Sequence, residues 1–193
     1  MIFKIFGIRF EISYLFTAAL AIFIAADKTG NILIFLLAAM AHEVGHLLCM
    51  VILNAKPDEI VLNPGTIRIV KNSITTNNET LLILLSGPVI NLMIFLICIN
   101  FQAVKLFAVI NLVLFIFNLL PIEGLDGGSI LKLALKLKHS EKYAEKVLFI
   151  ITLFFASGLI FAFIYLVMNG RVNYSLPILF LYLILPYVIK KTC

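Results

Sequence analysis

A series of apolar stretches separated by short polar segments constrains this sequence more than any other feature. Half of these stretches reach the length of about 20 residues that a helix needs to cross the hydrocarbon core of a bilayer. With 63% hydrophobic and 13% charged residues, the chain has too little polar surface for a soluble globule. We therefore expect an all-α polytopic membrane protein of about six transmembrane helices, at residues 12–26, 31–53, 81–101, 106–120, 147–168 and 176–189. The first stretch lacks a small-residue cleavage pattern, so we interpret it as a retained span and not as a signal peptide.

Two polar segments interrupt this pattern. Between the second and third spans, residues 60–62 and 66–70 are strand-type and flank Asn63-Pro64-Gly65, which predicts a small hairpin-like insertion. Residues 130–146 carry five lysines and two glutamates, and this pattern is typical of an amphipathic helix at the membrane interface or of a solvated loop. His139 lies in that segment, and we interpret it as an ordinary surface histidine.

The distribution of basic residues predicts the orientation. With six spans both termini lie on one side, and 12 of the 15 lysines and arginines then fall on that same side. Only Lys28, Lys105 and Arg171 fall on the other. Because positive charge accumulates in cytoplasmic loops, we expect both termini in the cytoplasm.

The second span contains His42-Glu43-Val44-Gly45-His46. On a helix the two histidines lie one turn apart and about 40° apart around the axis, so both imidazoles can reach one zinc ion. Glu43 is then adjacent to the metal and could transfer a proton from an attacking water to a leaving amine. Ionisable side chains this deep in an apolar span are costly unless they are ligated or paired, which indicates a functional site.

A catalytic zinc usually takes a third protein ligand. Asp126 is the preferred candidate, because it follows the fourth span and is flanked by glycines that permit close backbone approach. Its structural alternative is a cap at the start of a helix over 129–138. Cys49 lies on the same face of the second span as His42 and is a second candidate ligand, or simply a small buried residue.

Three motifs in this order resemble the site-2 protease family of intramembrane zinc metalloproteases. They are His42-Glu43-x-x-His46, Ser86-Gly87-Pro88-x-x-Asn91 and Asn118-x-x-Pro121-x-x-x-Leu125-Asp126-Gly127-Gly128. The compact six-span layout is similar to the stage IV sporulation protein FB branch of that family. The resemblance implies one Zn²⁺ per chain held by His42, His46 and Asp126, with Glu43 as the catalytic residue. It also implies that Asn91 and Asn118 handle the substrate, although either could instead join helices by hydrogen bonds.

The same resemblance implies a single membrane-embedded metalloprotease domain over 1–193, with its core spans in 31–128. We expect neither a PDZ nor a CBS domain. The expected protein is a multi-pass integral protein of a bacterial cell membrane. Its expected substrate is a membrane-associated protein, a sporulation sigma-factor precursor or an anti-sigma factor, and an inhibitory membrane partner would regulate it. Nothing in the sequence indicates nucleic-acid binding.

A different class of function is a zinc-bound, non-proteolytic membrane scaffold or a metal transporter. A transporter spreads ionisable residues along several helices to form a path. Here they concentrate at one position in the membrane, which favours the protease.

Overall fold

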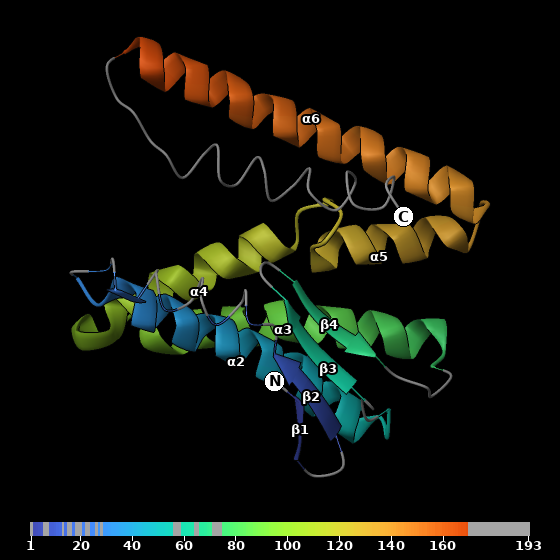
Figure 1. Ribbon diagram of the computed structural model, residues 1–193, viewed down its shortest axis with the longest axis horizontal. Coiled ribbons are helices and arrows are strands. Elements are labelled where there is room, and N and C mark those ends of the chain that lie inside the picture. The colour runs from blue at the N-terminus through green and yellow to red at the C-terminus, as the bar shows by residue number, and fades with distance from the viewer. Residues whose placement is uncertain are drawn as a thin grey trace. The chain divides into compact units, whose positions relative to one another are not determined.

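The computed structural model describes residues 2–5, 8–12, 14, 17, 21, 24–25, 27, 29–55, 59–63, 66–70 and 75–169. The chain divides into two compact units, Met1–Asn118 and Leu119–Cys193. Their elements in chain order are drawn in Figure 1.

The first unit is built on three helices. These are α2 (Asn31–Ile52), α3 (Asn77–Cys98) and α4 (Lys105–Asn118), with a short 3₁₀ helix, Gln102–Val104, before α4. α3 packs against both α2 and α4, and α2 also contacts α4. The predicted second and third spans are thereby confirmed as helices, whereas α4 is a shorter apolar helix than the predicted span.

α2 has one apolar exposed face and one buried face. Its exposed stripe is made of large apolar side chains, Leu33, Leu37, Met40, Val44 and Leu48. Its buried stripe contains small residues and the two histidines, namely Ala38, His42, Gly45, His46 and Met50. Because lipid accepts exposed apolar surface and excludes charge, the histidine motif faces the other helices and away from lipid.

Asp27 fixes the start of α2. One carboxylate oxygen accepts hydrogen bonds from the Thr29 amide (2.8 Å) and hydroxyl (2.6 Å), and the other accepts from the Ile32 amide (2.8 Å). The Thr29 hydroxyl, followed by the Ile32 amide, holds the pKa of Asp27 below its usual value. Gly30 at the cap position has no side chain, so Asp27 satisfies a free amide of the first turn in its place.

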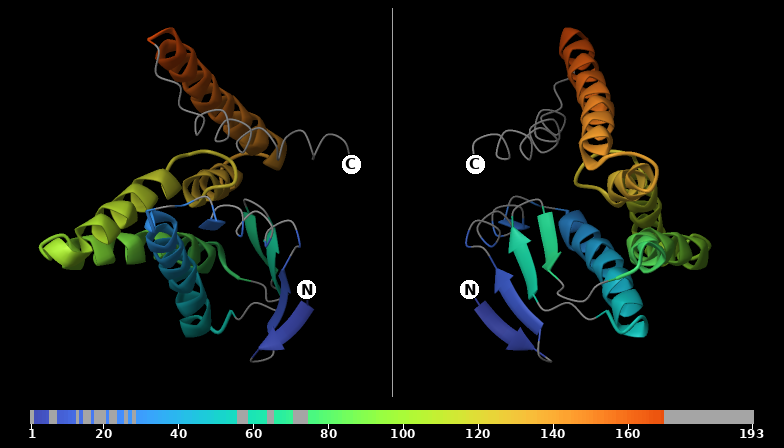
Figure 2. Two further views of the ribbon diagram at one scale, coloured as in Figure 1. Left: turned by 60° about the vertical axis from the view of Figure 1, so that its left-hand side comes forward. Right: turned by 90° about the vertical axis from the view of Figure 1, so that its right-hand side faces the viewer.

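A four-stranded sheet belongs to the same unit. Its strands are β1 (Ile2–Ile5), β2 (Ile8–Ile12), β3 (Glu59–Asn63) and β4 (Thr66–Val70), in the order β1-β2-β3-β4. β3 and β4 form the predicted antiparallel hairpin, with Leu62 opposite Ile67. The N-terminal strands were not predicted, and β2 joins the hairpin by parallel pairing with β3. Figure 2 shows the sheet on one side of α2 and α4 on the other.

The second unit contains α5 (Asp126–Lys136) and α6 (Glu141–Met168), which pack on each other. Residues 130–146 form neither of the two predicted alternatives, one interfacial helix or a loop, because they belong to two helices separated at residues 137–140. Ser140 begins a new helix by accepting a hydrogen bond from the Tyr143 amide. Ion pairs from Lys132 to Glu145 (3.0 Å) and from Lys136 to Glu141 join the two helices.

Three of the described helices, α2, α3 and α6, are long and apolar enough to cross a membrane. The predicted sixth span lies outside the described residues, and so does most of the predicted first span. The structure therefore describes a largely helical membrane architecture with at least these three candidate spans. The number six stays a prediction.

Candidate metal centre

His42 and His46 lie one turn apart on the buried face of α2, each with only 6% of its surface exposed. Their Nε2 atoms are 3.1 Å apart, and the rings meet edge to face. Two nitrogen ligands at about 2.0–2.1 Å from a tetrahedral zinc would be separated by roughly 3.4 Å. The two imidazoles are thus already at nearly the separation that one zinc ion requires.

A backbone carbonyl of α3 orients one of these rings. Nδ1 of His46 lies 2.7 Å from the carbonyl oxygen of Ile83, a buried residue one helix away. Because a carbonyl can only accept, Nδ1 must donate, and the proton of neutral His46 is assigned to Nδ1. This leaves the lone pair of Nε2 available for a metal, an arrangement common among metal-binding histidines.

Asp126 is the first residue of α5, so the expected helix begins three residues earlier than 129. The loop at 119–123 lies so close to the first turn of α5 that a side chain at position 127 or 128 of the helix would collide with the backbone of the loop. A Cβ on Gly127 would meet the carbonyl oxygens of Leu119 and Leu120, the latter at 2.6 Å, and a Cβ on Gly128 would meet the carbonyl of Ile122. The two glycines after Asp126 therefore permit the loop geometry that precedes the carboxylate.

His42, His46 and Asp126 form a group that could hold a metal ion. Each offers one ligand atom, and these atoms all lie within 4.8 Å of one another. Two imidazole nitrogens and one carboxylate oxygen are a donor set of catalytic zinc sites, where the fourth position remains open to water or substrate. These are the three residues that the sequence analysis names as ligands, and their role in binding metal stays a prediction.

Cys49, the other ligand considered, lies elsewhere on α2. It is half-buried and packs against the apolar cluster of Met50, Ala55 and Ile83. Among the described residues it is not part of a group of potential metal ligands. Its surroundings are those of a small apolar core residue.

The remaining predicted site residues occupy different environments. Glu43 is half-buried beside His42 on α2. Asn91 on α3 is completely buried, and in the described part of the chain no group hydrogen-bonds to its side-chain amide. Asn118 ends α4 and donates a hydrogen bond to the Leu114 carbonyl (3.1 Å).

Sequence reasoning missed two buried polar residues. Asn111 on α4 is completely buried and donates to the Phe107 carbonyl (2.8 Å). Thr152 on α6 is 2% exposed, and its hydroxyl accepts a hydrogen bond from the Glu123 amide (3.1 Å) in the loop before Asp126. Both are single polar residues in apolar helices, and a polar residue at membrane depth is the signal that could have identified them.

Two comparisons with known proteins found a similarity. Residues 99–161 match the family model of peptidase family M50, a range that includes Asn118 and Asp126 but not His42, Glu43 or His46. The fold is similar to the solved structure of a site-2 protease from Methanocaldococcus jannaschii, with a TM-score of 0.70 and 21% sequence identity. That similarity covers 95% of this chain and 91% of the other. No curated protein matches the sequence.

The family match includes the third motif, from Asn118 to Gly128, the shared fold extends over almost the whole chain, and the two histidines and the aspartate form a candidate metal site. Residues 99–161 are therefore similar to peptidase family M50, and the fold of the chain is similar to that of a site-2 protease.

Proposed function

We propose that this protein is a zinc endopeptidase that cleaves a membrane-associated protein within or next to the bilayer. The observation that carries the proposal is the group of His42, His46 and Asp126, whose ligand atoms lie within 4.8 Å of one another. In this proposal the three residues hold one Zn²⁺ per chain. When bound, zinc supplies Lewis-acid polarisation of the scissile carbonyl and lowers the pKa of an attacking water.

Glu43 is the proposed general base and acid. It adjoins His42 in the sequence and is partly accessible, whereas both histidines are buried. A carboxylate at this position takes a proton from the attacking water and returns it to the nitrogen of the leaving amine as the peptide bond breaks. Nδ1 of His46 donates its proton to the Ile83 carbonyl, so Nε2 of that ring is unprotonated and serves as the metal ligand. Glu43 is then the group that accepts the proton of the attacking water.

The substrate must be bound in an unwound form, because the carbonyls of a helix are hydrogen-bonded internally and cannot be attacked. In lipid the unwound backbone needs new hydrogen-bond partners. β4 is an edge strand of the four-stranded sheet, and β3, its partner, follows α2 in the chain. We propose that the substrate adds to β4 as a further strand, a common mode of peptide recognition.

Asn91 and Asn118 are the proposed contacts to substrate near the cleavage site. The side-chain amide of Asn91 has no hydrogen bond to another described residue, although it is completely buried. A buried amide of this kind is costly unless it finds a partner. The backbone of a bound peptide can supply both the donor and the acceptor that Asn91 needs.

The proposed cellular role follows from the resemblance to the stage IV sporulation protein FB branch. The substrate is then a sporulation sigma-factor precursor or an anti-sigma factor, and a membrane partner inhibits the protease until it is needed. The protein is a single metalloprotease domain in a bacterial cell membrane with both termini in the cytoplasm. The 12 basic residues that share the side of the termini support this orientation.

Co-expression with candidate substrates tests the proposal. Membrane-tethered sigma-factor precursors and anti-sigma factors are expressed with the full chain or with its Glu43→Gln variant, and fragments are identified by mass spectrometry. A fragment cut within or beside the tether, present only with the unmodified chain, is the expected result. A metal-loaded protein that cuts none of them would favour the scaffold or transporter function instead.

A further inference from the structure

Gly87 of α3 is the backbone position that faces both metal-binding imidazoles. A Cβ built on Gly87 would overlap Nε2 of His46, and would lie 2.6 Å from Cε1 of His46 and 2.8 Å from Cε1 of His42. Carbon atoms pack at about 3.5–4.0 Å, so even a methyl group would overlap both rings by roughly 1 Å. The three nearest atoms all belong to the two histidines.

The neighbouring glycine of this helix pair has a different environment. A Cβ on Gly45 of α2 would meet Cγ1 of Ile90 at 2.9 Å, the carbonyl oxygen of Ser86 at 2.9 Å and the Cα of Gly87 at 3.1 Å. These include backbone atoms of α3, so Gly45 is the small residue that lets the two helix backbones approach each other. Gly87 instead leaves space for side chains of the opposite helix.

The rings have little freedom to move out of the way. The Nδ1 atom of His46 is tied to the Ile83 carbonyl, one turn before Gly87 on α3, and its Nε2 atom lies 3.1 Å from that of His42. The Ile83 carbonyl also accepts a hydrogen bond from the Ser86 hydroxyl (2.6 Å), which fixes the acceptor itself. Any rotation of His46 away from a methyl group at position 87 would therefore break one of these contacts.

We infer that Gly87 is a positioning residue of the metal centre: with no side chain of its own, it lets the Ile83 carbonyl hold the His46 ring and leaves both Nε2 atoms converging on one point. The role in metal binding rests on the proposed zinc site. The steric relationship between Gly87 and the two rings does not depend on that zinc site, so it can be tested in the metal-free protein.

The first test is a mutational cycle on the metal-free full chain in detergent. Gly87→Ala should lower the melting temperature by several degrees, and the same substitution should have almost no effect once His42 and His46 are both replaced by alanine. If Gly87 serves only to pack the helices, Gly87→Ala also lowers the melting temperature of the chain that lacks His42 and His46, and that result overturns the inference. The comparison remains informative if Gly87→Ala alone is too unstable to purify. Replacing His42 and His46 by alanine in that variant should then restore folding.

The second test measures metal affinity by competition with a chelator, using Zn²⁺ alone. Gly87→Ala should bind zinc at least about tenfold more weakly than the unmodified chain, the range typical of residues that orient metal ligands. Gly158→Ala is the matched control, since Gly158 also lies in an apolar helix but has no atom within 4 Å of an added Cβ. Its zinc affinity should be unchanged.

Gly45→Ala separates ring placement from helix spacing. The two variants are compared by the loss of zinc affinity relative to the loss of stability of the metal-free protein. This ratio should be smaller for Gly45→Ala than for Gly87→Ala. Equal affinities of Gly87→Ala and Gly158→Ala, in a chain that binds zinc, would refute the inference and leave the proposed function intact. A complete lack of zinc binding by the unmodified chain would refute both.

Discussion

The carbonyl oxygen of Ile83 lies 2.7 Å from Nδ1 of His46, so a backbone group of one apolar helix fixes the tautomer of a candidate metal ligand on another. This contact spans 37 residues of sequence, and it requires the close packing of α2 and α3. The candidate metal centre therefore depends on helix packing as well as on the His-Glu-x-x-His spacing.

The identity of the third ligand can be tested by metal analysis. Asp126→Ala should remove most of the bound zinc, because it deletes the only carboxylate in the group with His42 and His46. Cys49→Ala should leave the zinc content nearly unchanged, since Cys49 packs in an apolar cluster. The reverse pattern in purified protein would place the whole site on α2.

Thr152 should stabilise the loop that precedes Asp126. Thr152→Val keeps the shape of the side chain but removes the acceptor for the Glu123 amide, at an expected cost of about 1–3 kcal/mol in the free energy of unfolding. Thr152→Ser retains the hydroxyl and should recover most of that loss. Equal melting temperatures of the valine variant and the unmodified chain would contradict a structural role for this hydrogen bond.

Proline substitutions in β4 test the docking of substrate on this edge strand. Ile67→Pro or Ile69→Pro removes a backbone donor and should impair cleavage, whereas alanine at the same positions should be milder. Zinc content, measured in parallel, identifies variants that have simply misfolded. Uniform tolerance of proline across residues 66–70 would exclude β4 as the docking site.

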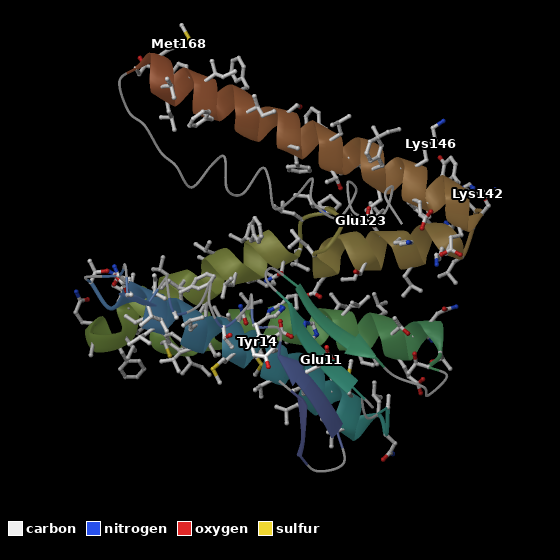
Figure 3. All side chains as sticks on the ribbon, in the orientation of Figure 1. Glu11, Tyr14, Glu123, Lys142, Lys146 and Met168 are labelled. Carbon is white, nitrogen blue, oxygen red and sulfur yellow. The ribbon has the colours of Figure 1, made fainter. Side chains whose placement is uncertain are left out.

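The orientation in the membrane can be tested by labelling single cysteines in intact cells. A cysteine near Lys142 or Lys146, which Figure 3 shows at the N-terminal end of α6, should be protected from an impermeant reagent added outside. A cysteine at Arg171, just beyond α6 in the sequence, should react. Labelling of the lysine-rich end from outside would overturn the predicted topology.

The sequence was most informative where one local pattern determined one element. The apolar run of residues 31–53 predicted α2 almost to the residue, and the strand-type residues around Asn63-Pro64-Gly65 predicted the β3–β4 hairpin. The start of α3 was placed too late because its capping box was overlooked. In that box, Thr76 accepts from the Glu79 amide and Glu79 accepts from the Thr76 amide.

What could not be predicted depends on contacts between distant segments. The N-terminal strands alternate polar and apolar residues at Arg9, Phe10 and Glu11, but their place in the sheet depends on parallel pairing with β3, about 50 residues away. The sequence identifies Gly87 only as part of the motif Ser86-Gly87-Pro88, and the packing of α3 on α2 is what places it against the two imidazoles. The chemical identity of the ligands is local information, whereas their orientation is not.

The most direct test of the proposed chemistry is the Glu43→Gln variant, assayed for cleavage of a membrane-tethered substrate and for bound metal in the same preparation. The amide removes proton transfer but no metal ligand, so we expect about one zinc per chain and a loss of cleavage of roughly 100-fold or more. Cleavage at the unmodified rate, with zinc still bound, would contradict the assignment of Glu43 and the mechanism built on it.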